Sequence, residues 1–263
     1  MTETDQHDTT TASAAVLVER DGPVAVVRLN RPAARNAVNV DLATALVEAM
    51  ERTADARCIV VTGEGPAFCA GLDLRNLGTD RLADLPPFIE AVRRSPVPTI
   101  AAVNGPAVTG GFEVALACDF MVASTNAAFA DTHLRVGVYP GPVLVDLPRR
   151  VGMAKARELS LTGNFVDAAE AARIGLVNHV VEPDALMDAA LGLAHAIAEQ
   201  DPAMVATMRR DWDDTGSLPY ADAHRRHREN AVAAGFADAG SDTLRSNMAA
   251  VVDRSRTQRA PRD

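Results

Sequence analysis

The sequence predicts an α/β protein, with a layered core of strands and helices followed by a helical C-terminal region. Short apolar runs alternate with amphipathic segments over the first two thirds of the chain. From residue 154 onward apolar residues recur at three- and four-residue spacing, which is typical of helices, apart from a short strand at 177–181. The 263 residues are 48% apolar and 23% charged, a composition that can form one large core.

The first elements are a hairpin and a helix. Residues 16–29, VLVERDGPVAVVRL, read as two strands around Asp21-Gly22, a pair that tolerates positive φ. After the loop 30–39, Asp41 is expected to cap a helix. Its core-facing residues are Leu42, Ala45, Leu46, Ala49 and Met50. A buried strand at 58–62 and a loop at 68–73 follow.

A second round repeats this order. It consists of a helix at 87–94, a strand at 98–103, a glycine-bearing loop at 104–111, a short helix ending at Cys118 and a strand at 120–124. The alternation of strands and helices predicts a layered core. Helical spacing then recurs in segments 184–200, 202–214, 220–236 and 243–254.

This pattern predicts three parts of the chain. Residues 1–13 are polar and are expected to form a disordered leader, because they lack the apolar stretch of a signal peptide. Residues 14–200 form the core. Residues 201–263 form a helical region, whose Ala- and Met-rich faces are expected to pack against another subunit.

Composition excludes several classes of protein. A net charge of −9 with one Trp and two Tyr argues against a nucleic-acid partner. No run of eighteen apolar residues could span a membrane, so a cytoplasmic protein is expected. Cys58, Cys69 and Cys118 are odd in number and lack C-x-x-C spacing, so they are expected to be buried thiols, with no disulfide and no metal site.

The loop before the short helix is the candidate site. Gly110 and Gly111 open this helix, whose first N–H groups lack partners inside it. A second N–H from the loop around Gly71-Leu72 could join them to bind a carbonyl oxygen that becomes an oxyanion. Two plainer interpretations stay open: the glycines permit tight packing, and Glu113 reaches back to cap the helix.

Several motifs occur in order between residues 16 and 181. They are Asn30-Arg31-Pro32 with Asn36-Ala37; Phe68-Cys69-Ala70-Gly71-Leu72-Asp73; Ala102-Val103-Asn104-Gly105, Gly110-Gly111-Phe112-Glu113 and Cys118-Asp119; Phe129, Gly137 and Pro140-Gly141; and Leu161-Thr162-Gly163, Ala171 and Gly175-Leu176-Val177. Together they resemble the enoyl-CoA hydratase/isomerase (crotonase) family. The resemblance implies a crotonase-like spiral of strand–strand–helix repeats, with a C-terminal helical region that forms homotrimers, often paired into hexamers.

The resemblance also implies the substrate and its contacts. Coenzyme A would enter only as part of an acyl-CoA thioester, with no metal or redox cofactor. The N–H groups of Leu72 and Gly110 would form the oxyanion hole. The adenine and pantetheine path would be lined by Ala70, Leu72, Asp73 and Leu74. Arg35 would meet the phosphates, and Arg31 and Arg75 are further arginines placed to be tested for this.

One departure from the family pattern concerns the acid–base pair. Hydratases of this family hold a water between two glutamates twenty residues apart. The first is kept as Glu113, but the second position holds His133. An imidazole can accept or donate a proton near neutral pH, so a Glu113/His133 pair could still act. Alternatively, His133 is tethered to Asp131 or to the backbone, and Tyr139 or Asp146 serves as a reserve acid.

Two smaller departures accompany it. Thr109 stands where a third glycine is common, and residues 142–146 lack the usual Gly-Gly-Thr. The function expected is that of an enoyl-CoA hydratase-like enzyme that adds water to a 2-enoyl-CoA. The alternatives are another acyl-CoA reaction on the same fold, namely isomerisation, decarboxylation or thioester hydrolysis, and a non-catalytic acyl-CoA binding protein.

Overall fold

The computed structural model describes residues 14–73, 75, 84–235, 248 and 252 of the chain. The chain divides into two compact units after Pro202. The leader expected at 1–13 and most of the helix expected at 243–254 lie outside the described residues, as does Leu74.

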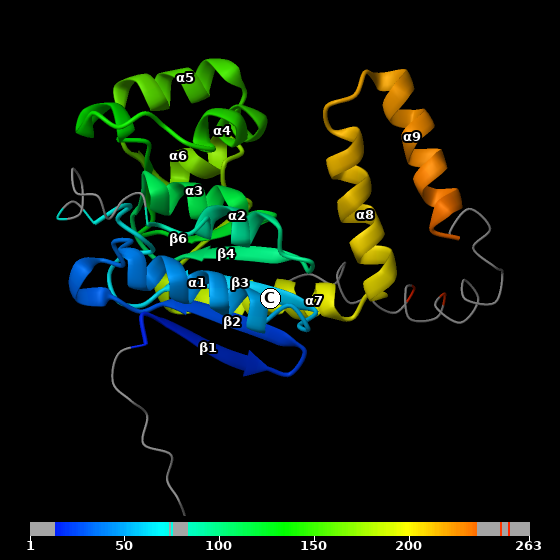
Figure 1. The fold of residues 1–263 in the computed structure, drawn as a ribbon, viewed down its shortest axis with the longest axis horizontal. Coiled ribbons are helices and arrows are strands. Elements are labelled where there is room, and N and C mark those ends of the chain that lie inside the picture. The colour runs from blue at the N-terminus through cyan, green and yellow to red at the C-terminus, as the bar shows by residue number, and fades with distance from the viewer. Residues whose placement is uncertain (1–13, 74, 76–83, 236–247, 249–251, 253–263) are drawn as a thin grey trace, which may run out of the picture. The chain divides into compact units, whose positions relative to one another are not determined.

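The first unit is built on a six-stranded sheet (Figure 1). Its strands in spatial order are β1 (Val16–Asp21), β2 (Val24–Leu29), β3 (Cys58–Gly63), β4 (Thr99–Val103), β6 (Phe120–Ser124) and β9 (His179–Val181). β1 and β2 form the expected antiparallel hairpin, with Gly22 in its turn at φ 57°. From β2 to β9 all neighbours are parallel, so their carboxyl ends share one edge of the sheet.

Both faces of the sheet are buried, because successive side chains of a strand point to opposite sides. On one face, Val60 and Ile100 pack with α7 (Leu186–Ala198). On the other, Val61 and Ala101 belong to the larger core that includes α1 (Val40–Arg52), α2 (Phe88–Arg93) and α3 (Gly110–Ala117). This alternation explains why the strands read as continuous apolar runs.

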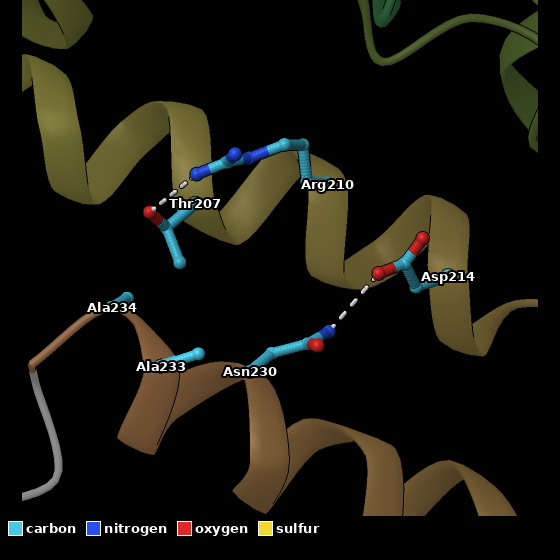
Figure 2. A pocket seen from close by; sticks show the side chains of 6 residues that line it. All are labelled: Thr207, Arg210, Asp214, Asn230, Ala233 and Ala234. Carbon is cyan, nitrogen blue, oxygen red and sulfur yellow. Dashed lines mark hydrogen bonds between the residues drawn. The ribbon is translucent and has the colours of Figure 1, made fainter.

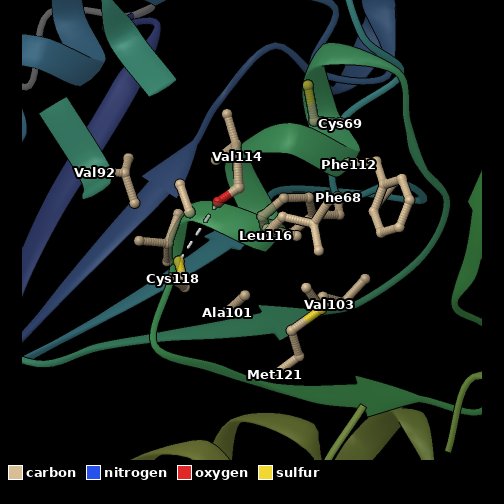
Figure 3. Close-up of a cluster of buried hydrophobic side chains, with 14 of the residues drawn as sticks. Phe68, Cys69, Val92, Ala101, Val103, Phe112, Val114, Leu116, Cys118 and Met121 are labelled. Atoms are coloured by element: carbon tan, nitrogen blue, oxygen red, sulfur yellow. Dashed lines mark hydrogen bonds between the residues drawn. The ribbon is translucent and has the colours of Figure 1, made fainter. Parts of the chain in front are cut away.

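Helix α3 lies in the middle of the larger core (Figure 3). All eight of its residues are buried. Phe112 and Leu116 belong to the same buried cluster as Val103 of β4 and Met121 of β6. Glu113 is the one charged side chain of this apolar helix, and burial of a carboxyl group costs free energy unless partners compensate it.

A small second sheet extends the unit beside α3. It contains β5 (Ala107–Val108), β7 (Ala128–Ala130) and β8 (Val166–Asp167), with β5 and β7 parallel and β8 antiparallel to β7. Further elements among the described residues of the unit are η1 (Pro32–Ala34), η4 (His133–Val136), α4 (Val143–Val151), α5 (Met153–Thr162), α6 (Ala168–Arg173) and η5 (Pro183–Ala185).

The cap of α1 differs from the expectation. Asn39, not Asp41, is the N-cap residue, and its Oδ1 accepts a hydrogen bond from the Leu42 N–H at 3.0 Å. Asp41 lies in the first turn, where its negative charge still favours the positive end of the helix. Both residue types can cap a helix, so the sequence alone did not distinguish them.

The three cysteines are buried thiols, as expected. Burial raises the pKa of Cys69 and of Cys118 to about 12. The Cys69 thiol donates to the Asn36 carbonyl at 3.1 Å, and the Cys118 thiol donates to the Val114 carbonyl at 3.6 Å (Figure 3). Both thiols therefore act as small apolar residues of the core.

The second unit contains α8 from residue 203 onward (Pro202–Thr215) and α9 (Tyr220–Ala233). The Asn230 amide of α9 donates to Asp211 at 2.7 Å and to Asp214 at 3.2 Å, both on α8. The two helices enclose a polar cleft of about 200 Å³ (Figure 2). It is lined by Thr207, Arg210, Asp214, Asn230, Ala233 and Ala234, none of which was predicted as a site residue.

No helix within the described ranges combines the length and the apolar character needed to cross a membrane.

Candidate active site

The loops that follow β3 and β4 meet at one edge of the sheet. They are adjacent because β3 and β4 are parallel neighbours. The Asn104 side chain joins them, since its Oδ1 accepts from the Gly63 N–H at 3.2 Å and its amide donates to the Gly65 carbonyl at 2.8 Å. The Cys69 carbonyl accepts from the Val108 N–H at 2.9 Å. Segment 69–72 is thereby held against segment 107–111.

The backbone N–H of Leu72 points away from Val38, the residue that pairs with it in a β-bridge. Leu72 and Val38 form a parallel bridge, in which Val38 donates to the Gly71 carbonyl and Asp73 donates to the Val38 carbonyl. Backbone N–H groups of successive residues point to opposite sides of an extended chain. Because the Asp73 N–H points to Val38, the Leu72 N–H is directed away from it. This leaves it available on the side opposite to Val38.

Close backbone approach brings Leu72 and Gly110 together. A Cβ on Gly110 would lie 3.9 Å from the Leu72 nitrogen. Gly71, at φ 90°, would place a Cβ 2.8 Å from the Val108 carbonyl oxygen, so only glycine fits there. Gly110 is the first residue of α3, where the N–H has no acceptor within its own helix. The two predicted donors therefore lie on adjacent turns.

Glu113 lies one turn after Gly110, on the same face of α3. Its side chain is about 4% exposed, and Oε1 accepts a hydrogen bond from the Val143 N–H at the start of α4, at 3.1 Å. Burial raises the pKa of Glu113, against the opposing effects of this hydrogen bond and of His133. The carboxyl group therefore holds a proton more firmly than an exposed glutamate does. The sequence left open that Glu113 caps the start of its own helix, α3, but this hydrogen bond is made to α4.

The Glu113 carboxyl group faces the ring of His133. His133 begins η4 and is buried, and its Nε2 lies 3.8 Å from Glu113 Oε2. Its other ring nitrogen, Nδ1, lies 2.6 Å from Asp131 Oδ1. The tether to Asp131 that the sequence suggested is thus present, and it leaves Nε2 turned toward Glu113.

Neither reserve acid has the environment of a second catalytic acid. The Asp146 carboxylate accepts two hydrogen bonds from the Arg93 guanidinium, one of them at 2.9 Å. Tyr139 is 84% exposed. Arg93 lies 53 residues before Asp146, so no local pattern could have revealed this pair.

Arg31 and Arg75, two of the arginines to be tested for phosphate contacts, meet at Asp73. Asp73 is buried, and its carboxylate accepts from Arg75 at 2.8 and 3.0 Å and from Arg31 at 3.4 Å. Arg35 is exposed, and its carbonyl accepts from the Ala70 N–H at 3.0 Å. The structure thus brings Arg35 close to Ala70 and places Arg31 and Arg75 on a shared carboxylate.

Replacing Asp73 with asparagine is expected to weaken the fold in a pH-dependent way. Hydrogen bonds from Arg75 lower the pKa of Asp73 from 3.8 to about 2, against the effect of burial. A lowered pKa stabilises the folded state at pH values above the ordinary pKa of the group. This contribution is lost as pH falls from about 4 to about 2. Because Arg75 is exposed, we expect a loss of about 1 kcal/mol at pH 7.

Urea unfolding of wild type and D73N at pH 7 and pH 3 measures this difference. Asp55→Asn is the control, because Asp55 forms an exposed ion pair with Arg20 and should contribute less. A stability difference for D73N that is equal at the two pH values would contradict the prediction.

Asn36 organises the site, although the sequence named it only as part of a motif and gave it no role. It is fully buried, adopts φ 56°, and its Oδ1 accepts from the Arg31 N–H at 2.8 Å. Its amide donates to the carbonyls of Ala67 and Phe68 at 2.8 and 3.1 Å. Asparagine tolerates positive φ better than most residues, and this preference is the one sequence feature that could have indicated a turn at Asn36. Asn36 holds the loop that ends in Leu72.

Thr109 adopts a conformation that suits glycine. Its φ of 52° and ψ of −117° are strained for a β-branched residue, at a cost of about 1–3 kcal/mol. Its hydroxyl forms a hydrogen bond with that of Thr132 at 2.7 Å. This contact links the strained residue to the segment that follows β7.

We expect Thr109→Gly to be more stable than Thr109→Ala by about 1 kcal/mol. Both variants lose the hydroxyl, but only glycine relieves the strain, whereas at ordinary φ glycine is the less stable residue of the two. Free energies of unfolding in urea measure the order. An alanine variant as stable as the glycine variant would show that the backbone at Thr109 is not strained.

The chain is similar to known proteins over nearly its whole length. Residues 19–240 match the family model described as enoyl-CoA hydratase/isomerase. The chain is 37% identical to the enoyl-CoA hydratase EchA19 of Mycobacterium tuberculosis, over 80% of this chain and 84% of that protein. It is 44% identical to a probable enoyl-CoA hydratase of Rhizobium meliloti, over 70% and 75% of the two chains.

A crystal structure of an enoyl-CoA hydratase from Mycobacterium tuberculosis superposes with a TM-score of 0.80 at 32% identity, and covers 94% of this chain and 98% of that one. This similarity confirms the crotonase-like α/β fold. The family model spans most of the sequence, and the Mycobacterium tuberculosis EchA19 and Rhizobium meliloti proteins are 37% and 44% identical to it. The chain therefore belongs to the enoyl-CoA hydratase/isomerase family.

Proposed function

We propose that this protein is an enoyl-CoA hydratase-like enzyme that adds water to the double bond of a 2-enoyl-CoA. The observation that carries the proposal is the pair formed by Glu113 Oε2 and His133 Nε2, which lie 3.8 Å apart. Two polar atoms at this separation can both hydrogen-bond one water molecule. Glu113 also shares a helix face with Gly110, so the pair lies beside the proposed oxyanion hole.

The first step is polarisation of the thioester. The N–H groups of Leu72 and Gly110 bind the carbonyl oxygen and stabilise the negative charge that develops on it. Each such donor contributes about 2.7–4 kcal/mol to transition-state stabilisation. Electron withdrawal through the conjugated system makes the β-carbon electrophilic, so a water oxygen can form a bond to it.

The acid–base pair then moves two protons. His133 Nε2 takes a proton from the attacking water while the hydroxyl oxygen bonds to the β-carbon and the electron pair moves onto the thioester oxygen. Glu113, whose pKa is raised by burial, gives its proton to the α-carbon as the enolate collapses. Proton transfer from the imidazolium to the Glu113 carboxylate restores both groups, and the product is a 3-hydroxyacyl-CoA.

The rest of the substrate follows the loops around Asp73. Ala70, Leu72, Asp73 and Leu74 would line the adenine and pantetheine path, and Arg35 would meet the phosphates. Support comes from the exposure of Arg35 and from the hydrogen bond that its carbonyl accepts from the Ala70 N–H, which places the backbone of Arg35 beside Ala70. Arginine is suited to phosphate recognition by its forked, permanent charge.

A steady-state assay with 2-enoyl-CoAs of short, medium and long chain tests the proposal. Saturable loss of the enoyl absorbance, with a 3-hydroxyacyl-CoA identified by mass spectrometry, is the expected result. A shifted double bond, loss of carbon dioxide or release of free coenzyme A would replace hydration by isomerisation, decarboxylation or thioester hydrolysis. Tight binding without turnover of any thioester would identify a binding protein.

A homotrimer or hexamer is the assembly that we propose, with residues 201–263 at its subunit contacts. A further argument for assembly is a set of exposed apolar side chains on the packed elements η4, α4 and α5, which monomers rarely leave uncovered. They are Leu134, Val136, Leu144, Val145, Met153 and Leu161.

Light scattering after gel filtration should give three or six times the 27.7 kDa of one chain. A monomer at micromolar concentration would contradict the assembly. A cytoplasmic location belongs to the same proposal, and cell fractionation with an antibody tests it.

A further inference from the structure

Asp131 makes two contacts with His133 through one oxygen atom. It follows β7, and its side chain is 1% exposed. Oδ1 lies 2.6 Å from His133 Nδ1 and accepts from the His133 backbone N–H at 3.3 Å. One carboxylate oxygen therefore contacts both the ring and the main chain of the same residue, which limits the rotation of the imidazole about its side-chain bonds.

The carboxylate also sets which ring nitrogen carries a proton. A carboxylate can only accept hydrogen bonds, so Nδ1 must be the donor in this contact. In the neutral imidazole the lone pair then lies on Nε2, the atom that faces Glu113. The hydrogen bond from His133 contributes to a lowered pKa of Asp131, although burial opposes it. The carboxyl group is therefore ionised where it meets the ring.

We propose that Asp131 is a positioning residue that holds His133 with Nδ1–H toward itself and Nε2 toward Glu113, so that the imidazole can serve as the proton acceptor of the reaction. This inference rests on the proposed function, because it assigns a purpose to the pair that carries it. Asp131 itself is separated from the Glu113 side of the ring and touches no reacting atom.

Charge balance supports the assignment. Two carboxylates that share one proton have a net charge of −1. A histidine and a glutamate that share one mobile proton have a net charge of zero, whether both groups are neutral or the two carry opposite charges. Adding the Asp131 carboxylate restores the charge of −1 and stabilises the imidazolium that forms when Nε2 takes a proton. Asp131 thus compensates for the presence of His133 where a second glutamate is expected.

The other oxygen of Asp131 points to the same conclusion. Within the described part of the chain, Oδ2 is buried and has no hydrogen-bond partner of ordinary geometry. The Ser160 hydroxyl is near enough to help lower the pKa of the carboxyl group. A buried carboxylate with an incompletely bonded oxygen costs stability, so its retention calls for a role beyond holding the turn in place.

A double-mutant cycle tests whether Asp131 acts through His133. We expect Asp131→Asn to lower kcat for enoyl-CoA hydration by about 10²-fold, and His133→Gln to lower it by a similar or larger factor. The double variant should be no slower than His133→Gln alone, because Asp131 has nothing left to position. Losses that multiply in the double variant would overturn the inference.

Asp21→Asn is the matched control. Asp21 also contacts a histidine, His195 Nε2, at 2.9 Å, but this pair is exposed and lies outside the candidate site. It should leave kcat unchanged. A thermal unfolding curve for each variant separates loss of activity from loss of fold.

Nitrogen NMR of protein labelled with ¹⁵N-histidine gives a second readout, because it reports directly which ring nitrogen carries the proton. The wild-type His133 signals, assigned by their absence in His133→Gln, should report a proton on Nδ1. A proton on Nε2 in the neutral ring would overturn the inference. This spectrum remains decisive if Asp131→Asn fails to fold. Failure of the wild type to hydrate any enoyl-CoA would instead count against the proposed function.

Discussion

Replacing Glu113 with glutamine is expected to reduce kcat for enoyl-CoA hydration by about 10²- to 10⁴-fold. The glutamine keeps the size of the side chain, and its oxygen can still accept from the Val143 N–H, so the position of the side chain is preserved. What is lost is the exchangeable proton for the α-carbon. Single-turnover kinetics at saturating substrate measure the chemical step without the effect of product release.

The same variant is expected to be at least as stable as the wild type, and its advantage should grow with pH. Burial raises the pKa of Glu113 above 4.5, so folding favours the protonated acid. The stability gained in this way is fully present at pH values below the ordinary pKa of glutamate. It is lost as pH rises through the pKa of Glu113 in the folded state. Glutamine never ionises and so avoids that loss.

Urea unfolding of E113Q and wild type at pH 5 and pH 8 checks the sign. A variant that becomes less stable relative to the wild type as pH rises would mean that the carboxylate, not the acid, is the form stabilised by the fold. Glu51→Gln, on the exposed face of α1, is a control that should alter neither kcat nor the pH dependence.

Alanine at Gly110 and at Gly111 should have opposite effects on activity and on folding. A Cβ at Gly110 would lie 3.9 Å from the Leu72 nitrogen and from the end of the Phe88 ring, which is ordinary contact distance. Gly110→Ala should therefore fold, but its methyl group would occupy space between the two proposed donors. We expect a loss in kcat/KM of about 10²-fold or more, comparable to the loss of one oxyanion donor.

Gly111→Ala should instead lose several kcal/mol of stability, about 3 or more. Its Cβ would lie 2.2 Å from the Cys69 carbonyl oxygen and 2.6 Å from the Cys69 Cβ, so two backbone segments would have to separate. Thermal unfolding and expression in soluble form measure this effect. A stable Gly111→Ala protein, or a fully active Gly110→Ala protein, would contradict the packing of the two loops.

Local pattern was sufficient for most of the first unit. The Asp21-Gly22 turn and the apolar runs of β3 and β4 lie where the sequence predicts them, because burial on both faces produces a strong signal. The two-residue strand β5 was not predicted, since two residues carry no periodicity. The prediction of Asp41 as the cap of α1 was wrong, because the cap depends on the backbone conformation of Asn39.

The site was less accessible to local reasoning. Glu113 and His133 were paired through resemblance to a family, and the structure brings their side chains together. The contact between Asp131 and His133 is local, two residues apart, and was visible as an alternative in the sequence. Pairing of Asp146 with Arg93 was not predicted, since it depends on how α2 and α4 meet in three dimensions.

The buried thiols have a practical consequence for following motions of the core. Alkylating reagents attack the thiolate, and a pKa of about 12 leaves almost none of it at neutral pH in Cys69 and Cys118. Iodoacetamide should therefore label these positions only in molecules whose α3 layer has opened. The rate of labelling in dilute urea would measure how often that layer opens, without any engineered probe.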